Sequence, residues 1–352
     1  MSIVTRIYRI KNHSGRSALL TTAALVFIIV AGAFADQPGN TIYTVTGPIR
    51  LSEVQGVLPH EHLNSFFRSP KEALLEYDEA KAADQILTVL QTLKSQGINL
   101  VMDCTTINFG RHPVLLKRIS EESGIYIMVS TGIYGAAGQE YVPLNAYVES
   151  AEALASRWIS EFQDGIPATD IRPGFIKVGV DKGSPSSVER KLVRAAALTH
   201  KATGLTIANH VSGGNLEAAK VCLDILKEEG VSPEAWIFVH AQGVKDSKDL
   251  IQLARQGVWI ELDGLRDDPK RIEQHLSHLV ELKEAGLLHK VLLSHDGGAA
   301  PLGRTPRPMT TLMDKFVPLL RETGFSQTDI DQLIKVNPVK AFTVRRRILN
   351  DS

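Results

Sequence analysis

The chain has 352 residues, of which 43% are hydrophobic and 22% are charged, a composition typical of soluble globular proteins that excludes disorder and fibrous repeats. Its 39 basic and 39 acidic residues give a formal net charge of +0 and a pI near 7.2. Because such a chain has no long-range field of one sign, we expect neither nucleic acid nor a membrane surface as its main partner, and the expected substrate is a small molecule.

The first 35 residues have the three-part pattern of a secretory signal peptide. Four basic residues precede an uncharged apolar run over residues 18–34, which closes with Ala33-Phe34-Ala35. We therefore predict that residues 1–35 are cleaved off and that the mature protein is exported, either to the periplasm or out of the cell. An uncleaved membrane anchor is the alternative, but the run is short for a transmembrane span. Since no twin-arginine pair precedes the run, we expect export of the unfolded chain and metal loading outside the cytoplasm.

Two cysteines in an exported protein raise the question of a disulfide bond. Cys104 ends an apolar run typical of a buried strand, whereas Cys222 lies in the middle of a helical pattern. Because these two elements would face different layers, we predict two free, buried thiols.

Short β-branched runs alternate with longer amphipathic segments from Gly56 onward. The predicted strands cover residues 57–62, 98–104, 125–131, 174–180, 205–210, 235–240, 258–263 and 290–296. The predicted helices after them cover residues 71–95, 113–122, 145–162, 186–202, 215–229, 246–255, 269–285 and 309–322, and a final helix covers 327–343. Strict alternation with nearly continuous apolar strands indicates parallel strands buried on both faces.

The predicted fold class is therefore α/β, a single-domain (β/α)8 TIM barrel over residues 36–352, with 36–55 as a short N-terminal segment. A doubly wound open sheet is the alternative. It usually carries a glycine-rich G-x-G-x-x-G turn after the first strand, and this sequence has none.

Polar residues gather at the carboxyl ends of the predicted strands, where barrel enzymes place their active sites. They are His60, His62, Lys177, His210, His240 and Asp296. Side chains two apart on a strand point to the same side, so His60 and His62 face inward together while Glu61 points away. A single histidine at a strand end is most simply a hydrogen-bonded structural residue. Four imidazoles and a carboxylate at one rim predict a metal site, because buried polar groups without partners are costly.

Nitrogen ligands with one carboxylate favour zinc, with manganese, cobalt or iron as alternatives. Five such ligands exceed what one four-coordinate ion needs, so we expect two divalent ions. Two cations would repel the ammonium group of Lys177, and its neutral amine can react with carbon dioxide to form a carbamate that bridges them. The spacing alone leaves open whether Lys177 does so or merely borders the rim.

Other polar residues receive simpler interpretations. His295 should point away from the ion that Asp296 binds and orient a ligand from behind. Asp103 ends a strand on the same rim, where it either hydrogen-bonds a metal-bound histidine or caps a helix. No G-x-S-x-G elbow offers a serine nucleophile. The remaining histidines fall in helices or turns, with surface or packing roles: His112, His200, His275, His278 and His289.

In its motifs the sequence resembles the phosphotriesterase family of the amidohydrolase superfamily. The resemblance spans nearly the whole mature chain, and its order and spacing are specific. It rests on Thr44-Val45-Thr46-Gly47-Pro48-Ile49, Leu58-Pro59-His60-Glu61-His62, Thr131-Gly132-Ile133-Tyr134, Ile176-Lys177-Val178, Asn209-His210, Val239-His240, Ser294-His295-Asp296 and Asn337-Pro338.

This resemblance implies a binuclear metal site in a (β/α)8 barrel. By matching motif, one ion would be held by His60, His62 and Asp296, the other by His210 and His240, and an N6-carboxylated Lys177 would bridge them. The implied mechanism is attack of a metal-bridging hydroxide on a carbonyl or phosphoryl centre, with Asp296 accepting the proton. Tyr134 resembles a tyrosine that lactone-hydrolysing relatives carry near the exposed metal, where it would orient the leaving oxygen. The equal alternative for Tyr134 is an ordinary aromatic residue of the rim.

Two positions depart from the family pattern. Many relatives carry an acidic proton relay three positions after the second exposed-site histidine, and this place is taken by Gly243, so the relay is absent or different. The family's Gly-Leu-Asp after the seventh strand is followed by a His or an Arg, whereas Asp263 is followed by Gly264. Asp263 remains a candidate for orienting a ligand, and Arg266 would replace the missing side chain if its loop turns back toward the rim.

The loops after the seventh and eighth strands are short and polar, and they carry Arg266, Arg304 and Arg307. They lack a long apolar wall for an acyl chain or a hydrophobic triester, so a polar or anionic substrate held by an arginine fits better. Each arginine by itself is most simply a solvated loop charge. We therefore predict an exported binuclear hydrolase of lactones or carboxylic esters. The alternatives are phosphotriester or phosphodiester hydrolysis at the same site and a non-catalytic ligand-binding barrel, and a homodimer stays open.

Overall fold

The computed structural model describes residues 41–66 and 76–349. The predicted signal peptide, residues 1–35, lies outside the described residues, and so does the start of the helix predicted over 71–95. Within the described ranges, no helix is long and apolar enough to cross a membrane.

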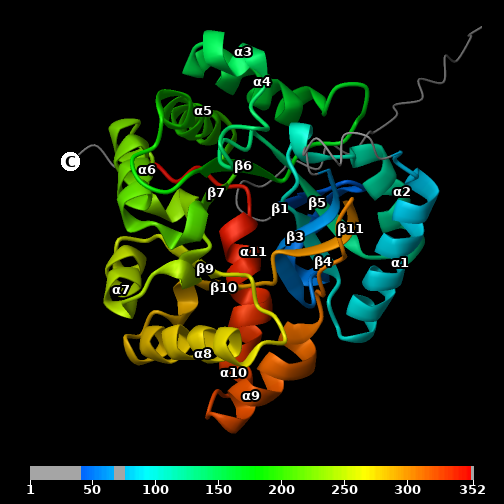
Figure 1. The fold of residues 1–352 in the computed structure, drawn as a ribbon, viewed down its shortest axis with the longest axis vertical. Helices are drawn as coiled ribbons and strands as arrows, with labels where there is room; N and C mark the ends of the chain where they lie inside the picture. Colours follow the sequence, from blue (N-terminus) through cyan, green and yellow to red (C-terminus); the bar gives the residue numbers. More distant parts are fainter. Residues whose placement is uncertain (1–40, 67–75, 350–352) are drawn as a thin grey trace, which may run out of the picture. The chain divides into compact units, whose positions relative to one another are not determined.

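A nine-stranded, curled parallel sheet forms the centre of this α/β fold (Figure 1). From one edge to the other the strands are β10 (Val291–Leu293), β9 (Trp259–Leu262), β8 (Trp236–Val239), β7 (Ile207–Val211), β6 (Phe175–Val180), β5 (Tyr126–Thr131), β4 (Leu100–Asp103), β3 (Val57–Phe66) and β11 (Gly297–Leu302). The strands from β3 to β10 follow one another in sequence order and in space, as expected for a TIM-like barrel. The N-terminal segment forms an antiparallel hairpin of β1 (Thr41–Thr44) and β2 (Gly47–Arg50).

The last predicted strand, residues 290–296, is divided into a part that pairs with each edge of the sheet. β10 pairs with β9, whereas β11 pairs with β3, with Gly297 opposite Glu61. Between them, the N–H of Asp296 donates to the carbonyl of His60 over 3.2 Å. The chain thus returns to its first core strand. The segment Gly297–Leu302, which the sequence placed in a polar loop, is instead a strand because it pairs with a β3 that extends beyond His62 to Phe66.

Alternate side chains of the strands pack into two separate cores. On β4, Leu100 and Met102 lie in an inner cluster, whereas Val101 packs with the helices in an outer cluster. The inner cluster also contains Ile42 of the hairpin and Phe342 near the C-terminus. Because both faces of each strand are buried, the strand sequences are nearly continuously apolar.

The helices lie around the outside of the sheet, except the last one, whose Ala341 and Phe342 pack in the inner cluster (Figure 1). They are α1 (Glu79–Ser95), α2 (Pro113–Ser123), α3 (Leu144–Val148), α4 (Ala151–Asp164), α5 (Ser187–Thr203), α6 (Leu216–Glu228), α7 (Ser247–Arg255), α8 (Pro269–Glu284), α9 (Val317–Glu322), α10 (Gln327–Asp331) and α11 (Asn337–Phe342). The helix predicted over 145–162 is two helices, because the extended residue Ser150 caps a new one by accepting from the N–H of Ala153. Asp78 caps α1 in the same way, so this helix begins at Glu79.

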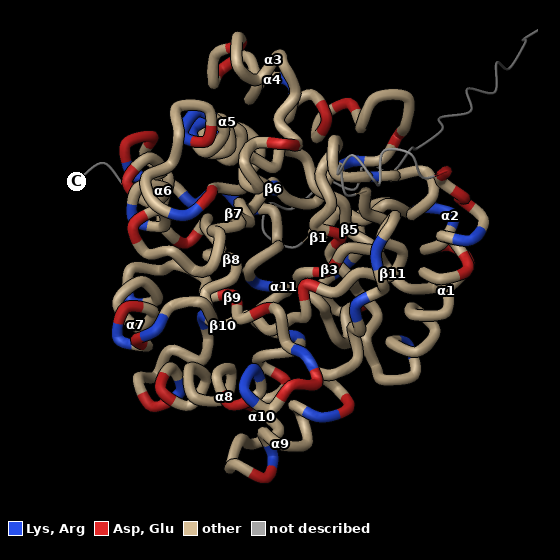
Figure 2. Tube along the Cα trace, viewed as in Figure 1, with Lys and Arg blue, Asp and Glu red and all other residues tan. Residues whose placement is uncertain are grey.

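Acidic and basic residues are interspersed on the peripheral helices α1, α7 and α8 (Figure 2). Arg194 of α5, for example, contacts both Glu228 and Glu229 at the end of α6. Such exposed pairs each contribute little to stability, and their mixture of signs agrees with the balanced charge of the sequence. Cys104 and Cys222 are both buried and free, as predicted.

Candidate metal centre

The six predicted metal ligands come from five parts of the barrel rim. His60 and His62 lie on β3, Lys177 on β6 and His210 on β7, while His240 directly follows β8 and Asp296 lies between β10 and β11. Four imidazole rings form a continuous series, with centroid distances of 5.6 Å from His62 to His60, 5.5 Å from His60 to His240 and 4.3 Å from His240 to His210. The fold therefore brings together residues that are up to 236 positions apart in sequence.

His60, His62 and Asp296 form a group that can hold one ion. Oδ1 of Asp296 lies 3.3 Å from Nε2 of His62 and 3.8 Å from Nε2 of His60. All three side chains aim their ligand atoms at the same point, and two imidazole nitrogens with one carboxylate oxygen suit a divalent transition metal.

A hydrogen-bond chain fixes the tautomer of His62. The hydroxyl of Thr105 donates to Oδ1 of Asp103 over 2.8 Å, so its oxygen accepts from Nδ1–H of His62 over 2.9 Å. Nε2 of His62 is then unprotonated and free for a metal, and burial lowers the pKa of this histidine to about 4. Asp103 makes no hydrogen bond to a histidine itself, which differs from one of the two sequence interpretations. It is connected to His62 only through Thr105, a residue that the sequence patterns did not indicate.

His60 is held from behind by two buried carboxyl groups. Its Nδ1 lies 2.9 Å from Oε2 of Glu261 and 3.2 Å from Oδ2 of Asp263, which leaves Nε2 facing the centre. Burial raises the pKa of Glu261. For Asp263 burial acts in the same direction, but the charges and hydrogen bonds of His240 and His60 outweigh it and hold the pKa well below its usual value. Glu261 stands where the family pattern has glycine, and sequence reasoning did not recognise it as part of the site.

Lys177 is buried beside His60, with its Nζ 3.2 Å from Nε2 of that ring. No carboxylate of a described residue lies within ion-pair distance of this amine. The bridging role that the family resemblance implies for Lys177 stays a prediction.

His210 and His240 face each other, with Nδ1 of the first 2.7 Å from Nε2 of the second. His240 adopts a left-handed backbone conformation with a φ of 64°, and Asp263 holds it there by accepting from its backbone N–H and from Nδ1–H, over 3.1 and 2.5 Å. Non-glycine residues in this conformation are uncommon and cluster at functional sites. The facing nitrogens of the two rings can hold a second ion.

A second chain of hydrogen bonds stands behind His210. Ser212 donates to Asp181 over 3.3 Å, and its oxygen therefore accepts from Nε2–H of His210 over 3.1 Å. The hydroxyl of Tyr134 also lies 3.1 Å from Nε2 of His210, and burial raises the pKa of this tyrosine. Tyr134 thus lies at the His210 side of the site with its proton retained.

Glu61 points away from the predicted ligands, and His295 points toward Glu61. The Glu61 carboxylate is saturated by four donors, namely the Ser294 hydroxyl, the backbone and Nδ1 of His295, and the backbone N–H of Gly297. These donors flank Asp296, which has a left-handed φ of 49°. The network fixes the bend at which Asp296 leaves the strand.

The structure explains why Gly243 occupies the position at which many relatives carry an acidic proton relay. A β-carbon at Gly243 would clash with the carbonyl of Gly213 and lie 2.9 Å from the nitrogen of Gly214. The turns after β7 and β8 therefore touch backbone to backbone, and no side chain fits there. Gln242, by contrast, contacts Asp263 through both its side-chain amide nitrogen and oxygen.

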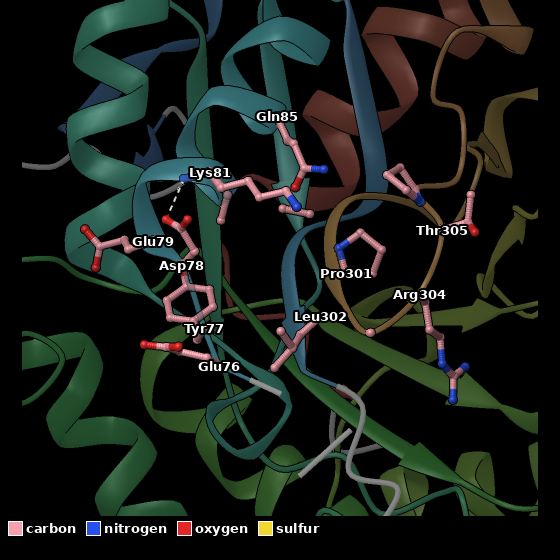
Figure 3. A pocket seen from close by; sticks show the side chains of 14 residues that line it. Glu76, Tyr77, Asp78, Glu79, Lys81, Gln85, Pro301, Leu302, Arg304 and Thr305 are labelled. Carbon is pink, nitrogen blue, oxygen red and sulfur yellow. Dashed lines mark hydrogen bonds between the residues drawn. The ribbon is translucent and has the colours of Figure 1, made fainter. Parts of the chain in front are cut away.

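The loop arginines lie in different surroundings. Arg307 donates to Oδ1 of Asp296 over 3.3 Å. Arg304 instead lines a hollow of about 890 Å³ between the start of α1 and the end of β11, on the far side of that hollow from Asp78 and Glu79 (Figure 3). None of the six predicted ligands lines this hollow.

The five histidines predicted to have surface or packing roles lie in helices, caps or turns, and three of them, His200, His275 and His278, are buried. His200, for instance, is buried, lies 2.8 Å from the carbonyl of Leu205 through Nδ1, and accepts from the backbone of Arg347 through Nε2. His278 lies 2.8 Å from the hydroxyl of Ser247.

Comparisons with known proteins agree with this arrangement. The family model described as phosphotriesterase family matches residues 40–342. The chain is 28% identical to a phosphotriesterase homology protein of Escherichia coli, over 81% of this chain and 97% of that one, and 27% identical to an aryldialkylphosphatase of Saccharolobus solfataricus, over 84% and 97%. A solved variant of a PTE-like lactonase from Deinococcus radiodurans has a TM-score of 0.79 and 28% sequence identity, covering 86% of this chain and 100% of that one.

The match extends over most of the chain, and the rim carries the imidazole and carboxylate groups that a metal-dependent hydrolase needs. The chain belongs to the phosphotriesterase family and is a metal-dependent hydrolase of that kind.

Proposed function

We propose that the protein is an exported binuclear metal hydrolase that cleaves lactones or carboxylic esters. The observation that carries the proposal is the orientation of the four rim histidines. Hydrogen bonds to Glu261, Thr105, Ser212 and Asp263 occupy one nitrogen of each ring, and the other nitrogen faces Asp296, Lys177 or the neighbouring ring. Such an arrangement orients the ligand nitrogens before a metal arrives.

We assign one ion to His60, His62 and Asp296, the other to His210 and His240, and the bridge to an N6-carboxylated Lys177. Zinc suits this ligand set best, with manganese, cobalt or iron as alternatives. When bound, two such ions would acidify a water molecule to a hydroxide nucleophile and polarise the oxygen of the scissile bond.

The protein's own residues would then orient the substrate and move protons. The Asp296 carboxylate is a proton acceptor at the centre. Tyr134, which keeps its proton because burial raises its pKa, would donate a hydrogen bond to the leaving oxygen. Its hydroxyl lies 3.1 Å from Nε2 of His210, the ring nitrogen turned away from His240, so Tyr134 lies beside this predicted ligand.

The substrate preference rests on the rim and on the relatives. One similar structure is a PTE-like lactonase, which supports a lactone or ester, and the polar loops after β9 and β11 favour a small polar molecule. A second relative, the aryldialkylphosphatase, favours phosphotriester hydrolysis as the alternative at the same site. Export rests on the signal pattern of residues 1–35.

Metal content and turnover of the purified mature protein test this proposal. We expect about two equivalents of metal in the parent and a loss of metal in a Lys177→Ala variant. Lys201→Ala, an exposed lysine on α5, is the matched control that should keep both ions. ¹³C NMR after incubation with labelled bicarbonate should show a carbamate signal that Lys177→Ala lacks. A parent that binds no metal under metal-replete conditions would contradict the proposal, and a metal-loaded parent inactive on lactones, esters and phosphoesters would favour a non-catalytic binding protein.

A further inference from the structure

The loop after β9 turns back toward the metal centre. The backbone N–H of Leu265 donates to the carbonyl of Ser294 over 3.3 Å, and the Leu265 side chain is fully buried. Since Ser294 is two residues from Asp296, this hydrogen bond brings the next residue, Arg266, to the bend that carries a predicted ligand. The hydrogen bond holds the start of the loop against the end of β10, and Arg266 follows directly after this contact.

Arg266 is half-buried and makes no side-chain hydrogen bond or ion pair with any residue of the described ranges. The acidic residues next to it are engaged elsewhere. Asp267 pairs with Lys315 over 2.6 Å, and Asp268 caps α8 by accepting from the N–H of Arg271. Burial lowers the pKa of Arg266, and the positive charge of Arg307 is the second cause of this decrease. A cation in such a position is stabilised by an anion that binds there.

Arg307 approaches the same bend from the other side. Its backbone forms two hydrogen bonds with Gly298, which fix it against β11. Its guanidinium donates to Oδ1 of Asp296 over 3.3 Å and to the carbonyl of Gly297 over 3.4 Å. That oxygen of Asp296 also faces the imidazole of His62, so the proposed metal would compete with Arg307 for it.

The other carboxylate near the two guanidinium groups is not available. Glu61 acts on the pKa of Arg266 from a distance, but its two oxygens are occupied by Ser294, His295 and Gly297. Arg271 adds another positive charge and is held on the carbonyl of Gly264. The rim therefore has more fixed positive than free negative charge beside the proposed ions.

We propose that Arg266 and Arg307 together bind an anionic group of the substrate, a carboxylate, sulfonate or phosphate, next to the bond that is cleaved at the metal centre. The proposal rests on the proposed function and narrows it to substrates that carry such a group. Planar guanidinium groups bind these oxyanions with paired, charge-assisted hydrogen bonds. Arg304 has no part in this subsite, because it lines the separate hollow beside α1 (Figure 3).

Two esters with the same leaving group test the subsite. They are neutral 4-nitrophenyl acetate and the mono-4-nitrophenyl ester of glutaric acid, which carries a free carboxylate. We expect Arg266→Gln to lower kcat/KM for the anionic ester by about 10- to 100-fold, mainly through KM, which corresponds to the loss of one charge-assisted hydrogen-bonded contact. The neutral ester should be cleaved as before, which also reports that the variant is folded and metal-loaded. Arg307→Gln should also lower kcat/KM for the anionic ester, but it should affect the neutral ester as well, because Arg307 contacts Asp296. Arg304→Gln should change neither ester.

An equal effect of Arg266→Gln on both esters, or no effect on either, would overturn the subsite while leaving the hydrolase intact. If the metal-loaded parent cleaves neither ester, a binding measurement decides the subsite by itself, and the proposed function fails only if lactones and phosphoesters are not cleaved either. In that measurement phenylglyoxal modifies arginines of the metal-loaded protein, and mass spectrometry follows Arg266. Protection by glutarate but not by the neutral glutaramide supports the subsite, and equal or absent protection overturns it. Comparing the carboxylate with a sulfonate and a phosphate of similar length then ranks the anionic groups.

Discussion

The carboxylate of Glu61 accepts two hydrogen bonds from His295, one from Nδ1–H over 2.7 Å and one from the backbone N–H over 3.2 Å. Nε2 of His295 in turn accepts from the N–H of Leu312 over 3.0 Å, which confirms that the proton is on Nδ1. The residue between these contacts and β11 is Asp296, in its left-handed conformation. Asp263 has the same relationship to His240, whose backbone is also left-handed. In both places a buried carboxylate binds the backbone that carries a strained predicted ligand.

Glu61→Gln should therefore weaken both the fold and the metal site. The amide would face donors with its own N–H groups, and an unsatisfied buried donor costs about 1–3 kcal/mol. We expect a loss of this size in the free energy of unfolding from urea titration, together with a lower metal content because Asp296 is no longer held. Glu121→Gln, at an exposed position of α2, is the control. Unchanged stability and metal content in the Glu61 variant would show that the network does not position Asp296.

Thr105→Val should lower the metal affinity without unfolding the protein. The variant removes the hydroxyl that accepts from Nδ1–H of His62, and loss of such a contact typically costs about 10- to 100-fold in affinity. Competition with a chromophoric chelator measures this change. Thr106→Val is the matched control, because the neighbouring Thr106 hydroxyl is buried and has no hydrogen-bond partner among the described residues. Equal affinities in the two variants would remove Thr105 from the site.

Gly243→Asp should not restore the family's proton relay. The β-carbon would clash with the backbone of Gly213 and Gly214, and overpacking of this kind costs about 1–3 kcal/mol. We expect a lower melting temperature and no gain in turnover. Gly230→Asp, whose β-carbon would meet no atom within 4 Å, should cost about 1 kcal/mol through its left-handed backbone alone. A Gly243 variant that is as stable as the parent and more active would contradict this account of the missing acid.

The stability of the fold should fall below pH 6.5 through His200. Burial lowers the pKa of this histidine to about 4, whereas in the unfolded chain it has its usual value near 6.5. Between these values only the unfolded state takes up the proton, so the free energy of unfolding decreases as the pH falls, by up to about 3 kcal/mol. His200→Gln supplies a donor and an acceptor without titrating, and it should reduce the slope of stability between pH 6.5 and 4. His289→Gln should leave the slope as in the parent, and a parent-like slope in the His200 variant would assign the pH dependence to other groups.

Local patterns in the sequence were sufficient to predict the strands and helices of the barrel. The alternation of apolar strands and amphipathic helices follows from burial of each strand on both faces, and the spacing of His60 and His62 follows from the pleat of a strand. The strand ends also predicted that Lys177, His210, His240 and Asp296 would lie at one rim, because the carboxyl ends of parallel strands meet there. Their roles as ligands remain predictions that metal analysis will test.

What only the tertiary structure decided are contacts between side chains on different strands and loops. Glu261 is the charged residue of an otherwise apolar strand. Its contact with Nδ1 of His60 depends on how the folded barrel brings β9 near β3. Thr105 and Ser212 depend on where the loops direct their hydroxyl groups, and β11 depends on the extension of β3 beyond His62. The clash at Gly243 likewise requires the turn after β7. Sequence periodicity is a property of one element at a time, whereas hydrogen bonds, steric exclusion and unpaired charges such as Arg266 depend on distances that exist only after the barrel has formed.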